Sequence, residues 1–394
     1  MSIRLLEVEG FKSLKEVSWR PGNLNVVIGP NGSGKSNLLQ FMELLRASAL
    51  GRMSERILQH GGIEALLWDG RAKAIKLRLE AGRTTEGKES VYFHYSLFLE
   101  RSGPWSEFRV SHELLNSDLS WPEPNTRVEI KREKGLASIY DTRSERLISI
   151  EQGISEGETL LSTGSVPALN LASYLFRQSI DSWAIYNGID TRRHASIRQP
   201  ALTRREMVVD PDGENLISVL HTFYTEDRDF RNELNAAMRA AFSDNFEELI
   251  FPPAADQRVQ LRVNWKHLKR SQPSGMLSDG TLRFLYLMAI LANPAPPALI
   301  AIEEPEVGLH PSMFPIIAEY AAQAAQKTQV IFTTHSADFL DAFRHTGTTP
   351  TTTVTQWRDG ATHLKVLEGD ELAYWLREYT LGQLFRSSEL EQIG

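Results

Sequence analysis

The chain has 394 residues, of which 41% are hydrophobic and 24% are charged, and its formal net charge is −7. This composition is typical of a globular protein and excludes a disordered chain, while the absence of cysteine excludes disulfides, thiolate catalysis and cysteine-ligated zinc. The acidic balance gives no global attraction to nucleic acid, and no apolar run approaches the ~18–20 residues of a membrane span, so we expect a cytoplasmic protein without a membrane partner.

The beginning of the chain contains strands, a glycine-rich loop and a helix in that order. Residues 3–8 and 17–20 are strand-like and flank the segment Gly10-Phe11-Lys12-Ser13. Residues 24–28 form a short run rich in β-branched side chains, which leads directly into the loop 29–36. Apolar residues then recur at helical spacing, so the pattern predicts a strand, a loop and a helix.

The middle of the chain changes from strand-like to helical patterns. Residues 74–80 alternate strictly between apolar and polar side chains, and residues 91–100 and 127–132 are also strand-like, which predicts an antiparallel meander. Residues 165–250 are mostly helical in pattern, most clearly at 215–223 and 230–242. A single strand is then predicted over residues 259–265.

The last third returns to alternating helices and strands. Residues 282–291 are apolar on nearly every side, which predicts a buried helix. Continuous apolar runs at 298–302 and 329–332 are typical of parallel strands covered on both faces, and a helix over 312–327 joins them. Strand-like residues 352–357 and 363–367 flank Asp359-Gly360, which predicts a hairpin.

The glycine-rich loop fits the pattern G-x-x-x-x-G-K-[ST]. Its glycines allow successive backbone N–H groups to point inward and surround phosphate groups, and the helix that follows adds the positive end of its dipole. Lys35 would reach the β- and γ-phosphates, and the hydroxyl of Ser36 would bind Mg²⁺. The predicted nucleotide contacts of this loop are Asn31, Gly32, Ser33, Gly34, Lys35, Ser36 and Asn37.

Polar side chains follow both predicted parallel strands. Glu303 and Glu304 end the first strand, and His335 follows the second, at the sheet edge where open α/β folds bind ligands. We expect Glu303 to hold Mg²⁺, Glu304 to deprotonate an attacking water, and His335 to contact the γ-phosphate.

A second anion-binding nest is predicted just before the buried helix. Ser278 and the N–H groups that begin this helix could surround an anion, although the same residue is by itself also a good N-cap.

These four elements, in this order, resemble an ABC-type ATPase head of the RecF, Rad50 and SMC branch. They are most similar to stand-alone AAA_21-type predicted ATPases and to the ATPase half of overcoming-lysogenization-defect (OLD) nucleases. Residues 10–14 resemble the opening motif of SMC and RecF proteins, which implies nucleotide contacts by Lys12 and Ser13. Residues 277–281 resemble the LSGGQ signature, with Asp279 and Thr281 in place of glycine and glutamine.

Residues 302–311 resemble the Walker B motif and the D-loop of this branch. Glu303 stands where an aspartate is usual, although glutamate occurs in this branch. The glutamine of the Q-loop has two candidates, Gln59 and Gln152, and neither matches well.

The resemblance implies an α/β fold with an ABC-ATPase-like head. The head would consist of residues 1–160 and 255–394, with a mixed or parallel core sheet and an antiparallel β subdomain, and residues 161–254 would form a mainly helical insert. It also implies a head-to-tail homodimer, in which ATP and Mg²⁺ held by one subunit are capped by Ser278, Asp279 and Gly280 of the other.

Three functions use this chemistry. The first is a switch that controls a separate effector such as a nuclease, as in prokaryotic anti-phage defence. About sixty residues follow His335, too few for a nuclease domain of typical size, and Asp338, Asp341 and Asp359 form no D-x-D pair. We therefore expect that any nuclease is a partner chain.

The second function is a RecF-like DNA-binding clamp in repair or recombination. The chain lacks the sustained heptads of a long coiled coil, but one segment is rich in arginine and contains no acid between its cations. These candidate phosphate contacts are Arg192, Arg193, Arg198, Arg204 and Arg205. The third function, a transporter subunit, is disfavoured by the altered signature and by the N-terminal motif.

Overall fold

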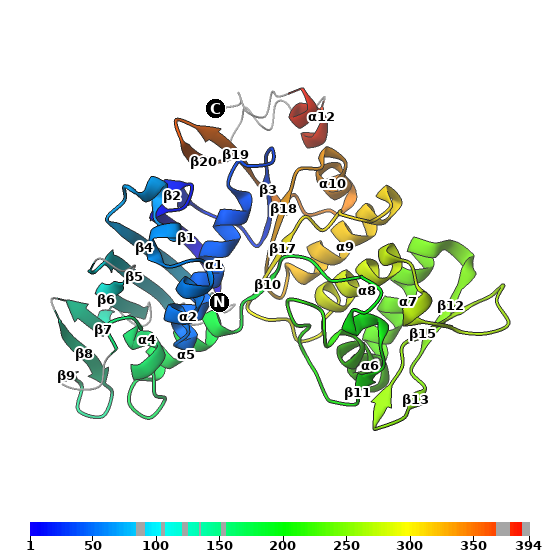
Figure 1. The fold of residues 1–394 in the computed structure, drawn as a ribbon, viewed down its shortest axis with the longest axis horizontal. Coiled ribbons are helices and arrows are strands. Elements are labelled where there is room, and N and C mark those ends of the chain that lie inside the picture. The colour runs from blue at the N-terminus through cyan, green and yellow to red at the C-terminus, as the bar shows by residue number, and fades with distance from the viewer. Residues whose placement is uncertain are drawn as a thin grey trace. The chain divides into compact units, whose positions relative to one another are not determined.

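The computed structural model describes residues 1–83, 91–103, 107–119, 125–133, 135–150, 155–367 and 379–387. The chain forms two compact units (Figure 1). Unit 1 consists of Met1–Gly22, Gly29–Trp183 and Thr353–Val366, and unit 2 of Asn23–Ile28, Ala184–Thr352 and Leu367–Gly394. Among the residues within these described ranges, no helix is long and apolar enough to cross a membrane. Gln152 lies outside the described residues.

Unit 1 is built on an eight-stranded antiparallel sheet with the strand order β2-β1-β4-β5-β6-β7-β8-β9. This confirms the predicted meander. The strands are β1 (Ser2–Phe11), β2 (Leu14–Trp19), β4 (Ala74–Arg83), β5 (Val91–Arg101), β6 (Phe108–Leu119), β7 (Asn125–Glu133), β8 (Leu136–Asp141) and β9 (Arg146–Ser149).

One face of this sheet is covered by helices of the same unit (Figure 1). The ring of Phe11 packs edge-on against Phe41 of α1, and Phe93 and Tyr95 contact Phe176 of α5. Each such fully buried ring contributes about 1.5–3 kcal/mol to folding. The helices are α1 (Lys35–Leu50), α2 (Met53–Gln59), α3 (Ile63–Leu66), α4 (Leu160–Gly164) and α5 (Leu171–Asp181).

The predicted C-terminal hairpin is also present. Strand β19 (Thr351–Arg358) pairs with β20 (Ala361–Val366), and Asp359 and Gly360 between them have φ angles of 51° and 75°. Two left-handed residues in succession are what a two-residue hairpin turn requires, and Asp-Gly adopts them readily. The indole Nε1 of Trp19 donates to Thr353 Oγ1 at 3.0 Å, so the hairpin is attached to β2.

Unit 2 is built on four parallel strands in the order β10-β17-β18-β3. They are β3 (Leu24–Ile28), β10 (Ala184–Tyr186), β17 (Leu299–Glu303) and β18 (Gln329–Thr334). Every residue of these four strands except Glu303 is buried, as expected for parallel strands covered on both faces. Strand β10 was not predicted and lies within the segment that we expected to be mainly helical.

Helices pack around these strands. In α8, ten of the side chains are buried, and all of them are apolar or aromatic except that of Thr281. The helices are α6 (Leu216–Glu226), α7 (Arg228–Phe242), α8 (Asp279–Leu291), α9 (Phe314–Ala324), α10 (Ala337–Asp341) and α12 (Leu381–Arg386).

Two small sheets complete unit 2. The first contains β11 (Ala201–Leu202), β14 (Arg258–Val259) and β13 (Pro253–Ala254), and the second contains β12 (Phe246–Ile250), β15 (Arg262–Trp265) and β16 (Gln272–Pro273). The prediction of one strand over residues 259–265 was therefore wrong, because the chain changes sheets between Val259 and Arg262.

Candidate nucleotide-binding site

The predicted phosphate loop joins the end of β3 to the start of α1 and has the backbone that its glycines allow. Gly32 and Gly34 have φ angles of 80° and 101°, in the left-handed region that side-chain-bearing residues rarely adopt. Gly34 is the N-cap of α1 and brings no side chain to the N–H groups of the first turn. This is the arrangement in which a helix N-terminus can accept a phosphate group.

The β19–β20 hairpin fixes this loop through two threonines that the sequence did not reveal. Thr355 Oγ1 lies 2.6 Å from Ser33 Oγ, and Thr362 Oγ1 donates to the carbonyl of Ser33 at 2.9 Å. These contacts join residues more than three hundred positions apart in the chain. They also explain two of the glycines: a Cβ at Gly29 would lie 2.1 Å from Thr355 Oγ1, and one at Gly34 would lie 1.9 Å from Thr362 Oγ1.

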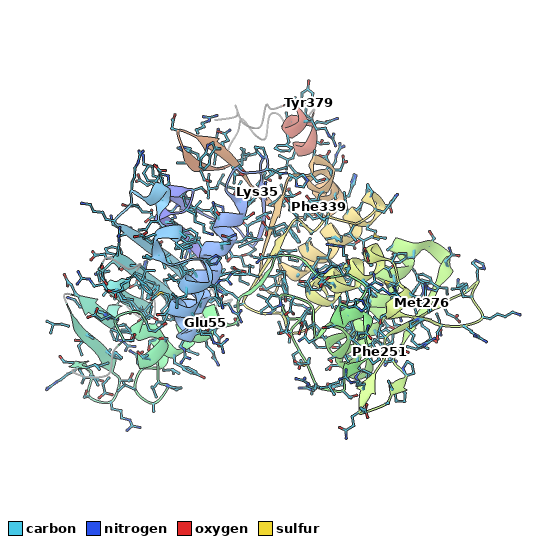
Figure 2. All side chains as sticks on the ribbon, viewed as in Figure 1. Lys35, Glu55, Phe251, Met276, Phe339 and Tyr379 are labelled. Atoms are coloured by element: carbon cyan, nitrogen blue, oxygen red, sulfur yellow. The ribbon has the colours of Figure 1, made fainter. Side chains whose placement is uncertain are left out.

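Lys35 is 5% exposed, and its ammonium already has partners within the loop (Figure 2). Its Nζ donates to the carbonyls of Gly29 at 2.7 Å and Pro30 at 3.0 Å. A phosphate would have to replace these carbonyl oxygens as the acceptor. The loop therefore holds the lysine ready without leaving a buried charge unpaired.

Ser13 and Asn37 lie beside the loop but form contacts within the protein. Ser13 is 8% exposed, and its Oγ accepts from Asn37 Nδ2 at 2.6 Å and is hydrogen-bonded to Thr362 Oγ1 at 2.7 Å. Lys12 has a positive φ of 45° and donates to Gln40, and burial together with nearby Arg56 lowers the pKa of its ammonium. The structure thus places Ser13 and Asn37 in one cluster with the loop, whereas the side chain of Lys12 contacts Gln40 of α1.

The acids and the histidine meet in unit 2, at the carboxyl ends of neighbouring strands. Glu303 ends β17 and stands opposite Thr333 of β18. Glu304 follows with a φ of 44°, and its carboxylate Oε1 lies 2.9 Å from Nδ1 of His335. The two residues predicted to act on the attacking water and the γ-phosphate are therefore hydrogen-bonded to each other.

Glu306 is an addition that the sequence analysis did not single out. It is 8% exposed, its Oε1 accepts a hydrogen bond from Thr334, and His335 Nδ1 lies 3.9 Å away. Among the described residues its Oε2 has no hydrogen-bond partner. Burial raises the pKa of this carboxyl group above its ordinary value. Its buried position between Thr334 and His335 could not be inferred from residue spacing alone.

Residues 277–281, called the signature segment below, include the first residues of α8. Ser278 is exposed and is the N-cap, accepting from the N–H of Thr281 at 3.1 Å. Asp279 forms an ion pair with Arg198, so its carboxylate is already neutralised within unit 2. Gly280 is close to the loop after β17, because a Cβ on it would lie 3.1 Å from the carbonyl oxygen of Gly308.

Ser36 of unit 1 and Glu303 of unit 2 each carry an oxygen of the kind that binds magnesium. Hydroxyl and carboxylate oxygens are the hard ligands that Mg²⁺ prefers, and the ion usually keeps several waters and takes few protein ligands. No group of three or more histidine, cysteine or acidic side chains that could hold a metal occurs in the described part of the chain.

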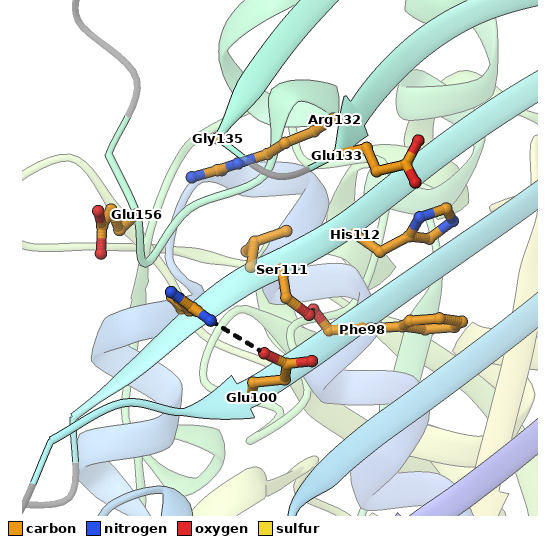
Figure 3. A pocket seen from close by; sticks show the side chains of 10 residues that line it. Phe98, Glu100, Ser111, His112, Arg132, Glu133, Gly135 and Glu156 are labelled. Atoms are coloured by element: carbon orange, nitrogen blue, oxygen red, sulfur yellow. Dashed lines mark hydrogen bonds and ion pairs between the residues drawn. The ribbon is translucent and has the colours of Figure 1, made fainter.

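A separate hollow of about 400 Å³ lies on the strands of unit 1 (Figure 3). Two of its cationic side chains have partners: Arg109 bonds Glu100 at 3.3 Å, and Arg132 donates to the carbonyls of Ser155 and Glu158. The hollow is lined by charged side chains of both signs, Arg109 and Arg132 together with Glu100, Glu133 and Glu156, so we assign no ligand to it.

Comparison with known proteins identifies the class. A family described as "AAA domain, putative AbiEii toxin, Type IV TA system" matches residues 24–156 and 189–341. The fold is that of an SMC head. It is similar to a crystal structure of an Smc head bound to the C-winged helix domain of ScpA, with a TM-score of 0.56, 15% identity, and coverage of 95% of this chain and 100% of the other.

A second similar structure is the Smc head from Pyrococcus furiosus with an extended coiled coil, bound to the C-terminal domain of ScpA. It has a TM-score of 0.53, 16% identity, and coverage of 95% of this chain and 98% of the other. No curated protein matches the chain. The chain belongs to the AAA-domain family named above, and it shares the fold of these Smc heads.

Proposed function

We propose that the chain is a Mg²⁺-dependent ATPase that dimerises head to tail around ATP and acts as a switch for a separate effector protein. The observation that supports this best is the hydrogen bond between Glu304 and His335, placed where two parallel strands end. This contact fixes the position of the Glu304 carboxylate, and a general base must be held within reach of the proton that it removes.

The residues predicted to act on the phosphates, the metal and the attacking water each have a task in this proposal. Lys35 exchanges the carbonyls of Gly29 and Pro30 for oxygens of the β- and γ-phosphates. Ser36 and Glu303 would hold Mg²⁺, which when bound neutralises charge on the phosphate oxygens. Glu304 accepts a proton from the attacking water, and His335 keeps its carboxylate in position.

Dimerisation is supported by the surface beside the signature segment. Ser278 is exposed at the N-terminus of α8, and the nearby apolar side chain of Met276 is 71% exposed (Figure 2). Val307, in the loop after β17, is 41% exposed. A γ-phosphate bound by two chains would give ATP a higher affinity for the closed dimer, and hydrolysis would remove that preference.

A protein effector is better supported than DNA. Among the five arginines expected to bind phosphates, Arg192 pairs with Asp190 and Arg205 with Glu226, whereas Arg198 is used inside the chain. The two Smc heads that share this fold are bound by domains of the protein ScpA. The family's description as part of a toxin–antitoxin system supports a role in prokaryotic defence. A DNA clamp is the second candidate, because Arg193 and Arg204 are exposed.

Lys35→Ala tests the phosphate loop. We expect ATP affinity, measured by equilibrium binding of a fluorescent ATP analogue, to fall at least tenfold, because a charge-assisted contact to phosphate is lost. Lys327→Ala, which removes an exposed lysine in the turn after α9, is the control and should bind normally. Unchanged affinity in Lys35→Ala would refute the site.

Glu304→Gln tests the general base. ATP binding should persist while turnover falls about 10²–10⁴-fold, the usual contribution of such a group. Glu16→Gln, which changes an exposed carboxylate on β2, is the control. Turnover by Glu304→Gln equal to that of the wild type would remove Glu304 from this role.

A further inference from the structure

Arg198 was expected to face nucleic acid, but its side chain is only 9% exposed. Its Nε donates to the carbonyl of Thr191 at 2.7 Å. Its Nη1 donates to the carbonyl of Leu277 at 2.7 Å and lies 3.4 Å from those of Ser274 and Gly275. One guanidinium therefore ties the segment around Thr191 to the turn that precedes the signature serine.

The same guanidinium also reaches the other side of that serine. Its Nη2 donates to the carboxylate of Asp279, the first residue of α8. Ser278 thus stands between two groups held by Arg198, the carbonyl of Leu277 and the side chain of Asp279. Only a planar side chain with several fixed N–H groups can make such a set of contacts, so lysine is not an equivalent replacement.

The ion pair between Arg198 and Asp279 also changes the charge at the start of α8. The N-terminus of a helix carries a partial positive charge that attracts anions, and a carboxylate in the first turn opposes the approach of a phosphate. Asp279 occupies this position in α8, and its side chain is 63% exposed. The charge of Arg198 cancels that of Asp279, so the helix terminus retains its attraction for an anion.

We infer that Arg198 is a positioning residue of the signature segment, which holds Ser278 in place and neutralises Asp279 so that the start of α8 can receive the terminal phosphate of ATP bound to a second copy of the chain. This inference rests on the proposed function. It also gives Asp279 a role different from the predicted contact with nucleotide, because Asp279 acts through Arg198.

The test measures ATP-dependent dimerisation by sedimentation in the Glu304→Gln background. Arg198→Ala should weaken dimerisation about tenfold or more, since charge-assisted hydrogen bonds are lost, while ATP binding by the separate chains stays unchanged. Adding Asp279→Asn to Arg198→Ala should restore part of the dimerisation, because the uncompensated carboxylate is gone. Arg192→Ala, which removes an exposed arginine paired only with neighbouring Asp190, is the matched control and should dimerise normally.

The partial recovery separates positioning from a purely structural role. If Arg198 only stabilised the fold, removing the charge of Asp279 would not help, and a double variant no better than Arg198→Ala would overturn the inference. Normal dimerisation by Arg198→Ala would also overturn it. If Arg198→Ala does not fold, as judged by thermal melting, Arg198→Gln, which also removes the charge but keeps a long polar side chain, is compared with and without Asp279→Asn in the same way. Failure of the Glu304→Gln parent to dimerise with ATP would instead refute the proposed function.

Discussion

The buried carboxyl group of Glu113 makes the stability of unit 1 depend on pH. Glu113 lies on β6, is fully buried, and accepts hydrogen bonds from Tyr95 Oη at 3.0 Å and from the N–H groups of Leu160 and Leu161 at 2.6 and 2.8 Å. Burial nevertheless dominates and raises its pKa from 4.5 to about 7. The folded chain therefore binds a proton that the unfolded chain releases over this range of pH.

The raised pKa of Glu113 determines both the sign and the size of the pH dependence of stability. Because the folded pKa is the higher one, the stability contributed by protonated Glu113 is present below about pH 4.5 and is lost as the pH rises through about 7. A shift of this size corresponds to about 3 kcal/mol, at 1.36 kcal/mol for each pKa unit. Glu113→Gln removes the titrating group and keeps a side chain of similar size.

The assay is denaturant unfolding of wild type and Glu113→Gln, monitored in the transition of unit 1 between about pH 4.5 and pH 8. The free energy of unfolding of the wild type relative to the variant should fall by about 3 kcal/mol across this range. Glu133→Gln, which changes a half-exposed carboxylate on β7, is the control and should follow the wild type. Parallel curves for wild type and Glu113→Gln would refute the assignment.

Three further predictions concern the candidate site. Thr362→Val removes the hydrogen bonds that Thr362 Oγ1 forms with the carbonyl of Ser33 and with Ser13 Oγ, each worth about 1 kcal/mol, and should lower ATP affinity several-fold in equilibrium binding; affinity equal to that of the wild type would show that the hairpin does not hold the loop. Gly34→Ala should lose nearly all ATP binding, because its Cβ would clash with Thr362, whereas Gly32→Ala, with no atom within 4 Å, should lose less, and the reverse order would contradict the steric argument. Ser278→Ala should abolish the ATP-dependent dimer seen by sedimentation while costing only about 1 kcal/mol of stability from the lost N-cap, and an intact dimer would remove Ser278 from the nucleotide site.

The sequence predicted the elements whose signals are local. The β-branched run before the phosphate loop, the apolar runs of β17 and β18, and the Asp-Gly turn of the hairpin each specify their structure within a few residues. Strand β6 was harder to recognise, because buried Glu113 interrupts its apolar alternation and a register shift occurs opposite Phe98 and Leu99. Strand β10 has only three residues, too few to show a period.

The contacts that organise the candidate site are mostly non-local, and for that reason the sequence did not reveal them. Thr355 and Thr362 reach the phosphate loop from the far end of the chain, and nothing in their own segment indicates this. Arg198 sits in an arginine-rich segment that suggested a phosphate-binding surface, yet its partners come from residues 274–279. Pairing across such distances is decided by tertiary packing.

The roles that we give to the individual site residues remain predictions, as does the division of the chain into a head and a helical insert. The central claim is an ATP-dependent dimer that controls a protein effector. Its most direct test is sedimentation of Glu304→Gln with Mg-ATP, with and without a short DNA duplex. We predict a dimer that forms only with ATP and is indifferent to DNA. The absence of any ATP-dependent dimer would contradict the account, and a dimer that binds the duplex would favour the DNA clamp instead.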